Sequence, residues 1–73
     1  MKYQPLHPEL LDWEDIKLAE NFAVKIFKNS VYVGLLDAEM KRCGKGVITY
    51  GSSRLYEGDW LDDRRHGVGF ERF

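Results

Sequence analysis

In residues 22–73, short stretches rich in apolar residues alternate with residues that favour turns. The stretches are FAVKIFK, VYVGLL, GKGVITY, RLYEGDW and HGVGFERF, and they are rich in β-branched and aromatic residues. Asn29-Ser30 and Gly51-Ser52-Ser53 supply two of the turns between them, and polar loops supply the other two. Short strands at this close spacing are typical of consecutive β-hairpins. The pattern predicts a mainly β fold in which five antiparallel strands form a meander.

Residues 1–21 follow a different pattern. Two prolines in MKYQPLHP remove backbone donors and favour extended conformations, so residues 1–8 are expected to form an extended arm. The next segment, PELLDWEDIKLAEN, has no glycine, a proline for the first turn and acidic residues near its start, which predicts a helix over about residues 9–20. An N-terminal region of arm and helix, residues 1–21, therefore precedes the sheet.

At helical spacing, Leu11, Leu18 and Phe22 fall on one side of this helix, whereas Trp13 and Ile16 fall well round toward another. One sheet face cannot cover both sides. The helix is therefore expected either to pack in a groove with part of its surface exposed, or to bridge its own sheet and a partner.

The sheet region contains an internal repeat. Tyr32-Val33-Gly34 recurs as Tyr56-Glu57-Gly58, 24 residues later, and Gly44-Lys45-Gly46 recurs as Gly67-Val68-Gly69, 23 residues later. The first copy therefore has one extra residue between its two strands. Each copy consists of a strand, a loop, a second strand and a turn.

Side-chain alternation in the second copy places Tyr56, Gly58 and Trp60 on one face of their strand. A glycine between two large aromatic residues leaves a gap, and Gly67 and Gly69 leave further gaps on the next strand. We expect aromatic rings and glycine gaps to interlock from one hairpin to the next.

The sequence YEGDWLDDRRHGVGFERF resembles a MORN repeat (membrane occupation and recognition nexus), in which Tyr-x-Gly-x-Trp is followed by a short polar loop and His-Gly-x-Gly. The residues that match this pattern are Tyr56, Gly58, Trp60, His66, Gly67 and Gly69. Residues 54–73 are thus identified as a clear copy. Residues 31–53 resemble a degenerate copy, with Leu36 in place of the tryptophan and Cys43 in place of the histidine.

This resemblance implies an elongated, twisted antiparallel sheet of stacked hairpins over residues 22–73. It also implies roles in scaffolding and in holding multi-protein assemblies together, sometimes an association with phospholipid, and no catalytic activity. Two repeats are fewer than the roughly three that stacked units usually need. We therefore expect either a fragment of a longer array or a small subunit whose stack a partner completes.

The favoured function is a non-catalytic scaffold module that binds other protein subunits of a larger assembly. Its last strand would present an open edge suited to strand addition. The expected partner-binding residues are Trp13 and Ile16 on the helix, and Trp60, Phe70 and Phe73 at the open end of the sheet.

An alternative function is that of a peripheral membrane adaptor. The pairs Lys41-Arg42 and Arg64-Arg65 occupy corresponding loops, so they would form a basic rim able to meet anionic phospholipid headgroups. Acidic residues in the same loops would offset much of this attraction. A third possibility is a passive spacer or cap with no binding surface of its own.

Composition argues against several other classes of function. The formal net charge of −1 argues against nucleic acid, which demands a basic face. Cys43 is the only cysteine, and with His7 and His66 it has no metal-ligand spacing, so neither a metal site nor a cofactor nor a catalytic residue is expected. Without a secretion signal, a reducing intracellular compartment fits best: the cytoplasm, cytoskeleton or cilium, or alternatively a mitochondrial complex.

Overall fold

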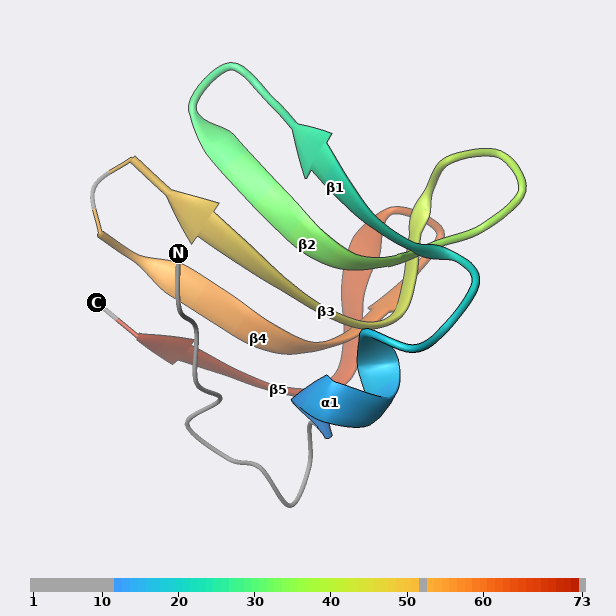
Figure 1. The fold of residues 1–73 in the computed structure, drawn as a ribbon. Helices are drawn as coiled ribbons and strands as arrows, with labels where there is room; N and C mark the ends of the chain where they lie inside the picture. Colours follow the sequence, from blue (N-terminus) through green and yellow to red (C-terminus); the bar gives the residue numbers. More distant parts are fainter. Residues whose placement is uncertain (1–11, 52, 73) are drawn as a thin grey trace.

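The computed structural model describes residues 12–51 and 53–72, which form one short helix and one sheet. The five strands lie side by side in sequence order, each antiparallel to the next, in a strongly twisted sheet with the helix on one face (Figure 1). The elements are α1 (Trp13–Ile16), β1 (Phe22–Ile26), β2 (Ser30–Leu36), β3 (Arg42–Tyr50), β4 (Leu55–Leu61) and β5 (Arg64–Arg72). The predicted mainly β, antiparallel meander is confirmed. The arm expected at residues 1–8 lies outside the described residues.

The helix α1 ends earlier than the sequence predicts. Asp12 caps it by accepting a hydrogen bond from the Asp15 N–H at 3.2 Å. It ends at Ile16 because the chain must turn back toward β1, and Asn21 is already bound to Leu36 by hydrogen bonds of 3.0 Å in both directions. The prediction that the helix continues to residue 20 is therefore wrong, and its expected start at residues 9–11 lies outside the described part of the chain.

The two faces of the sheet bury different clusters. On one face, which we call the aromatic face, five buried side chains pack together: Tyr32, Leu36, Ile48, Tyr56 and Trp60. On the other, the helix face, Ile16 of α1 packs on Val47 of β3, with Trp13, Phe22 and Leu35 around them. Phe22 thus belongs with Trp13 and Ile16, whereas Leu18 is exposed. The predicted grouping of Leu18 with Phe22 is wrong because the helix ends before Leu18.

The described strands make a body that is as wide as it is long. Its extents are 30 × 30 × 25 Å. Strands of seven to nine residues are about as long as five strands are wide, since neighbouring strands lie roughly 4.8 Å apart. The elongated outline implied for a stacked array is not seen with this number of strands.

A row of glycines crosses the aromatic face. Gly34 pairs with Gly46, Gly46 with Gly58, and Gly58 with Gly69. The Tyr32 ring lies directly against Gly46, and the Tyr56 ring against Gly69. The tyrosine hydroxyls donate hydrogen bonds to the carbonyl oxygens of Leu35 and Asp59, at 2.8 and 3.1 Å. Each tyrosine therefore fills a glycine gap in its own hairpin, rather than in the next hairpin as the sequence predicts.

The first glycine of each Gly-x-Gly has a separate role. Gly44 and Gly67 have φ angles of 58° and 59°, a left-handed conformation that other residues rarely adopt. The strand register shifts opposite each of them, after Gly34 and after Gly58, as in a glycine β-bulge.

Candidate functional site

Trp60 joins the two hairpins on the aromatic face. Its ring packs edge-on against Tyr32 and Tyr56, with centroids 5.2 and 5.3 Å apart. Its indole N–H donates a hydrogen bond of 3.1 Å to the carbonyl oxygen of Gly46 on β3. Trp60 is 4% exposed and forms the centre of the core, which leaves little of its surface for the predicted contact with a partner.

Arg42 covers this cluster from one side. Its guanidinium lies 4.6 Å from the Trp60 ring centroid and 4.9 Å from that of Phe27. It also donates hydrogen bonds to Asp63, from Nε to the carboxylate at 2.8 Å and from Nη2 to the carbonyl oxygen at 2.7 Å. Asp62 and Asp63 form the turn between β4 and β5, and both have positive φ, as a two-residue hairpin turn requires. Arg42 therefore ties the first hairpin to the turn of the second.

Arg65 covers the other side of the cluster. Its guanidinium lies 4.3 Å from the Tyr56 ring centroid and donates hydrogen bonds to Glu71 and to the Tyr50 hydroxyl, at 2.8 and 2.9 Å. Burial alone would lower the pKa of Arg65, but the hydrogen bonds to Glu71 and Tyr50 outweigh it and raise that pKa. Arg65 is thus a structural cation on the aromatic face.

The structure shows how the cations of the predicted basic rim are engaged. Arg42 and Arg65 contact aromatic rings and carboxylates within the sheet. Lys41 lies 3.8 and 3.9 Å from carboxylates of Glu39 and Asp62, and Arg64 is exposed. The four cations therefore do not form one continuous ridge of free charges.

Lowering the pH is expected to destabilise the fold through Asp63. Hydrogen bonds from the side chain and backbone N–H of Arg42 hold the pKa of Asp63 below its ordinary value of 3.8. A carboxyl group whose pKa is lowered by folding contributes its full stabilisation when the pH is above the pKa of that group in the unfolded chain. This contribution is lost as the pH falls through the pKa of the group in the folded protein. The free energy of unfolding should therefore fall more steeply below about pH 4 in the parent than in Asp63→Asn.

Urea unfolding of both proteins from neutral pH down to about pH 2 measures this difference. Asparagine suits the comparison because it tolerates the positive φ of the turn and cannot ionise. Parallel stability curves for the two proteins would show that the Arg42–Asp63 contact contributes nothing to folding.

The remaining predicted partner residues divide between core and surface. Ile16 is buried against Val47 of the sheet, which leaves little of its surface for the predicted contact with a partner. Trp13 is half-buried and packs edge-on against Phe22, with ring centroids 5.9 Å apart. Phe70 is half-buried on β5, and Phe73 lies outside the described residues.

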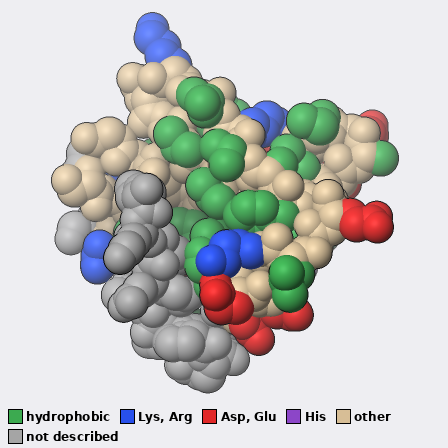
Figure 2. Space-filling model, viewed as in Figure 1, with side chains coloured by type: hydrophobic (Ala, Val, Ile, Leu, Met, Phe, Trp, Pro, Cys, Tyr) green, Lys and Arg blue, Asp and Glu red, His purple; other side chains and the backbone are tan. Residues whose placement is uncertain are grey.

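An exposed apolar patch on the helix face was missed by the sequence reasoning. Val24 and Ile26 of β1 are 57% and 77% exposed, and Val31 of β2 lies opposite Ile26 and is also exposed. Figure 2 shows a band of hydrophobic side chains over β1 and β2 on this face, with acidic side chains gathered around α1. The alternation in FAVKIFK, which puts Phe22, Val24 and Ile26 on one face, is the signal that could have found it.

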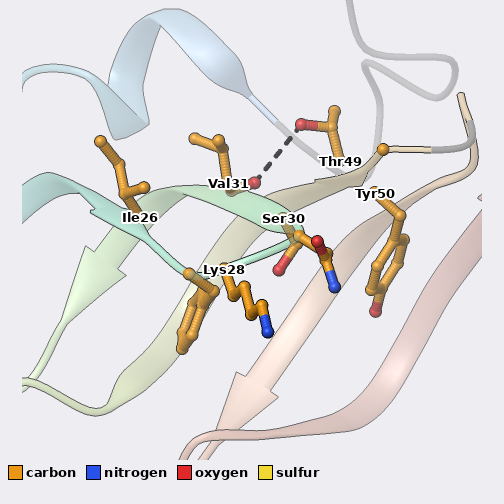
Figure 3. A pocket seen from close by; sticks show the side chains of 9 residues that line it. Ile26, Lys28, Ser30, Val31, Thr49 and Tyr50 are labelled. Carbon is orange, nitrogen blue, oxygen red and sulfur yellow. Dashed lines mark hydrogen bonds between the residues drawn. The ribbon is translucent and has the colours of Figure 1, made fainter.

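An open depression of about 460 Å³ adjoins this patch. Figure 3 shows Ile26, Val31 and Thr49 on one side of the strands and Lys28 and Tyr50 on the other. Its lining residues are Ile26, Phe27, Lys28, Asn29, Ser30, Val31, Thr49, Tyr50 and Gly51. The depression lies at the end of the first hairpin, and Lys28 is the one charged residue in its lining.

Other reactive groups are placed in structural settings. Burial, and secondarily the charge of Asp37, raise the pKa of the Cys43 thiol, which disfavours a reactive thiolate. Within residues 12–51 and 53–72 there is no cluster of three metal-ligating side chains. In the same part of the chain, no helix is long and apolar enough to cross a membrane.

Comparisons with known proteins agree with this geometry. A family model described as MORN repeat matches residues 41–53 and 56–73. Alsin from Homo sapiens, Mus musculus and Rattus norvegicus is in each case 44% identical over 45 residues, an alignment that covers 62% of this chain. The alignment covers 3% of Alsin, so this chain spans a small part of the length of these relatives. No solved structure matches the chain.

The matched ranges contain three of the five buried side chains of the aromatic face: Ile48, Tyr56 and Trp60. They also include both Gly-x-Gly pairs, with the left-handed glycines and the glycines against the tyrosine rings. MORN repeats are in general non-enzymatic modules that interact with proteins or membranes. The resemblance predicted from the sequence is confirmed: residues 41–53 and 56–73 match the MORN repeat model.

Proposed function

We propose that this chain is a non-catalytic scaffold module that binds an extended segment of another protein along the open edge of β5. The observation that carries the proposal is the position of β5: it pairs with β4 on one side and has no strand on its other side among the described residues. An unpaired strand edge offers a row of backbone donors and acceptors to an added strand. The edge lies at the end of the sheet in Figure 1.

The charges of β5 indicate the chemistry of the partner. Arg64 and Arg72 are exposed near its two ends, and neither forms an ion pair with any described residue. Val68 between them is exposed and Phe70 is half-buried. An extended segment that carries acidic residues together with apolar ones would complement this edge. The membrane alternative has less support, because Arg42 and Arg65 are engaged within the sheet.

Affinity capture from cell extract, followed by chemical cross-linking of the retained proteins, tests the proposal. The parent is compared with the charge reversal Arg64→Glu/Arg72→Glu. We expect the parent to retain a protein that cross-links next to β5, and the variant to retain at least about tenfold less of it. Two reversed charges would face like charges of the partner, and a loss of about 1.4 kcal/mol in binding free energy already lowers the affinity tenfold.

The matched control is Lys17→Glu/Lys28→Glu, which reverses two exposed cations outside β5 and its turn. It should retain the partner as the parent does. If both reversals release the partner equally, binding follows net charge and not the β5 edge. If the parent binds anionic vesicles and captures no protein, the membrane alternative replaces the proposal.

A further inference from the structure

The strand β1 forms the other edge of the sheet, and three of its residues point their backbone groups outward. The Phe27 N–H donates to the Ser30 carbonyl at 2.9 Å, and the Leu36 N–H donates to the Asn21 carbonyl at 3.0 Å. Antiparallel pairs alternate between hydrogen-bonded and non-hydrogen-bonded positions. Phe22, Val24 and Ile26 therefore lie at the positions whose N–H and C=O groups face away from β2.

This edge lacks the charged side chain that usually protects one. Lys25 is the only charged residue of β1, and its side chain lies on the aromatic face. It donates a hydrogen bond of 2.7 Å to the Met40 carbonyl and lies 3.9 Å from the Asp63 carboxylate. Val24 and Ile26 remain exposed beside the bare backbone edge. Such an edge favours pairing with another strand.

Residues 12–21 do not fill this edge. They reach β1 from α1, which packs on the helix face through the contact of Ile16 with Val47. Asn21 holds the end of this connection against Leu36. Residues 12–21 therefore lead into β1 from across the sheet and not from a strand beside it. Residues 12–21 therefore do not supply a strand that pairs with β1.

We propose that β1 pairs with β1 of a second copy of this chain, antiparallel and centred on Val24, so that the two sheets become continuous. This register places Val24 opposite Val24 of the second copy and Phe22 opposite Ile26. All of these are hydrogen-bonding positions, which gives about six backbone hydrogen bonds across the interface. The same side chains form an unbroken apolar row on the helix face.

Charge supports a second copy at β1 rather than at β5. In the register centred on Val24, Lys25 lies opposite Ala23, so no like charges meet directly. Self-pairing of β5 would bring together strands that each carry four arginines or histidines, Arg64, Arg65, His66 and Arg72, against one glutamate. Like charges directly opposite one another destabilise a strand pair. The two edges are therefore suited to different partners.

Sedimentation equilibrium of the full chain tests the proposal. The parent should associate reversibly into dimers as its concentration rises. Val24→Lys and Val24→Glu should each raise the dimer dissociation constant by about tenfold or more, because each places like charges opposite one another at the two-fold axis. An equimolar mixture of the two variants should recover dimers, which also shows that both variants fold.

Val68→Lys is the matched control, since Val68 is 55% exposed on the opposite edge strand and Val24 is 57% exposed. It should leave dimerisation unchanged. A parent that stays monomeric at high concentration, or a Val24→Lys variant that dimerises like the parent, overturns the proposal. Capture of a partner at β5 is measured separately, so the proposed function can hold or fail independently.

Discussion

Trp60→Ala should remove a large fraction of the free energy of unfolding of this protein. Removing a buried tryptophan costs about 3–5 kcal/mol, and a chain of this length typically has about 4–11 kcal/mol of stability in total. The substitution removes both edge-on ring contacts, the hydrogen bond to the Gly46 carbonyl and the surface on which Arg42 lies. Chemical unfolding followed by circular dichroism measures the loss.

Two comparison variants identify the cause. Trp60→Leu introduces the residue that the first repeat has at the corresponding position, Leu36, and should lose about half as much because part of the volume is restored. Leu61→Ala removes an exposed side chain from the neighbouring position and should change the stability by less than about 0.5 kcal/mol. A Trp60→Ala protein as stable as Leu61→Ala would mean that Trp60 does not hold the two hairpins together.

The strands were predictable because their alternation is local. Side chains of β2 and β4 alternate between two faces, and one face must be buried, so the apolar pattern of VYVGLL and RLYEGDW determines which face that is. The turn between β4 and β5 is shorter than the polar loop expected there, since only Asp62 and Asp63 form it, with the positive φ angles that aspartate tolerates. The helix was predicted less well, because four residues cannot be stable without tertiary packing and the sequence does not show where that packing ends.

The types of residue that form the site were predictable from the sequence, but the contacts between them were not. The sequence indicates that tyrosine rings fill glycine gaps, yet it does not show that each ring lies against a glycine of its own hairpin, because that depends on the register between the strands. Arg42 was expected on a solvated rim. It lies on Trp60 because the turn carrying Asp63 brings a carboxylate to it from 21 residues away in the sequence, and local patterns do not show such contacts.

Gly46→Ala should destabilise the fold by about 2 kcal/mol or more, although alanine is the smallest change available. A Cβ at Gly46 would overlap the Tyr32 ring, which is fully buried and is held by its hydrogen bond to the Leu35 carbonyl. The ring cannot move away without losing its contact with Trp60. The predicted effect is therefore one of crowding, and thermal unfolding monitored by circular dichroism measures it.

Gly51→Ala separates crowding from the general effect of replacing a glycine. Gly51 is exposed in the turn after β3, and a Cβ there would meet only the Asn29 carbonyl oxygen, at an ordinary 3.7 Å. Alanine should leave the stability unchanged or raise it by up to about 1 kcal/mol, because the unfolded chain loses conformational freedom. Gly46→Ala should cost less stability when it is made in Tyr32→Leu than when it is made in the parent. The shorter leucine side chain leaves room for the methyl group. Two results would contradict this explanation: an equal loss of stability for alanine at Gly46 and at Gly51, or an equal loss from Gly46→Ala in the parent and in Tyr32→Leu. In either case, the close packing of Tyr32 on the glycine row does not explain why the repeat has glycine there.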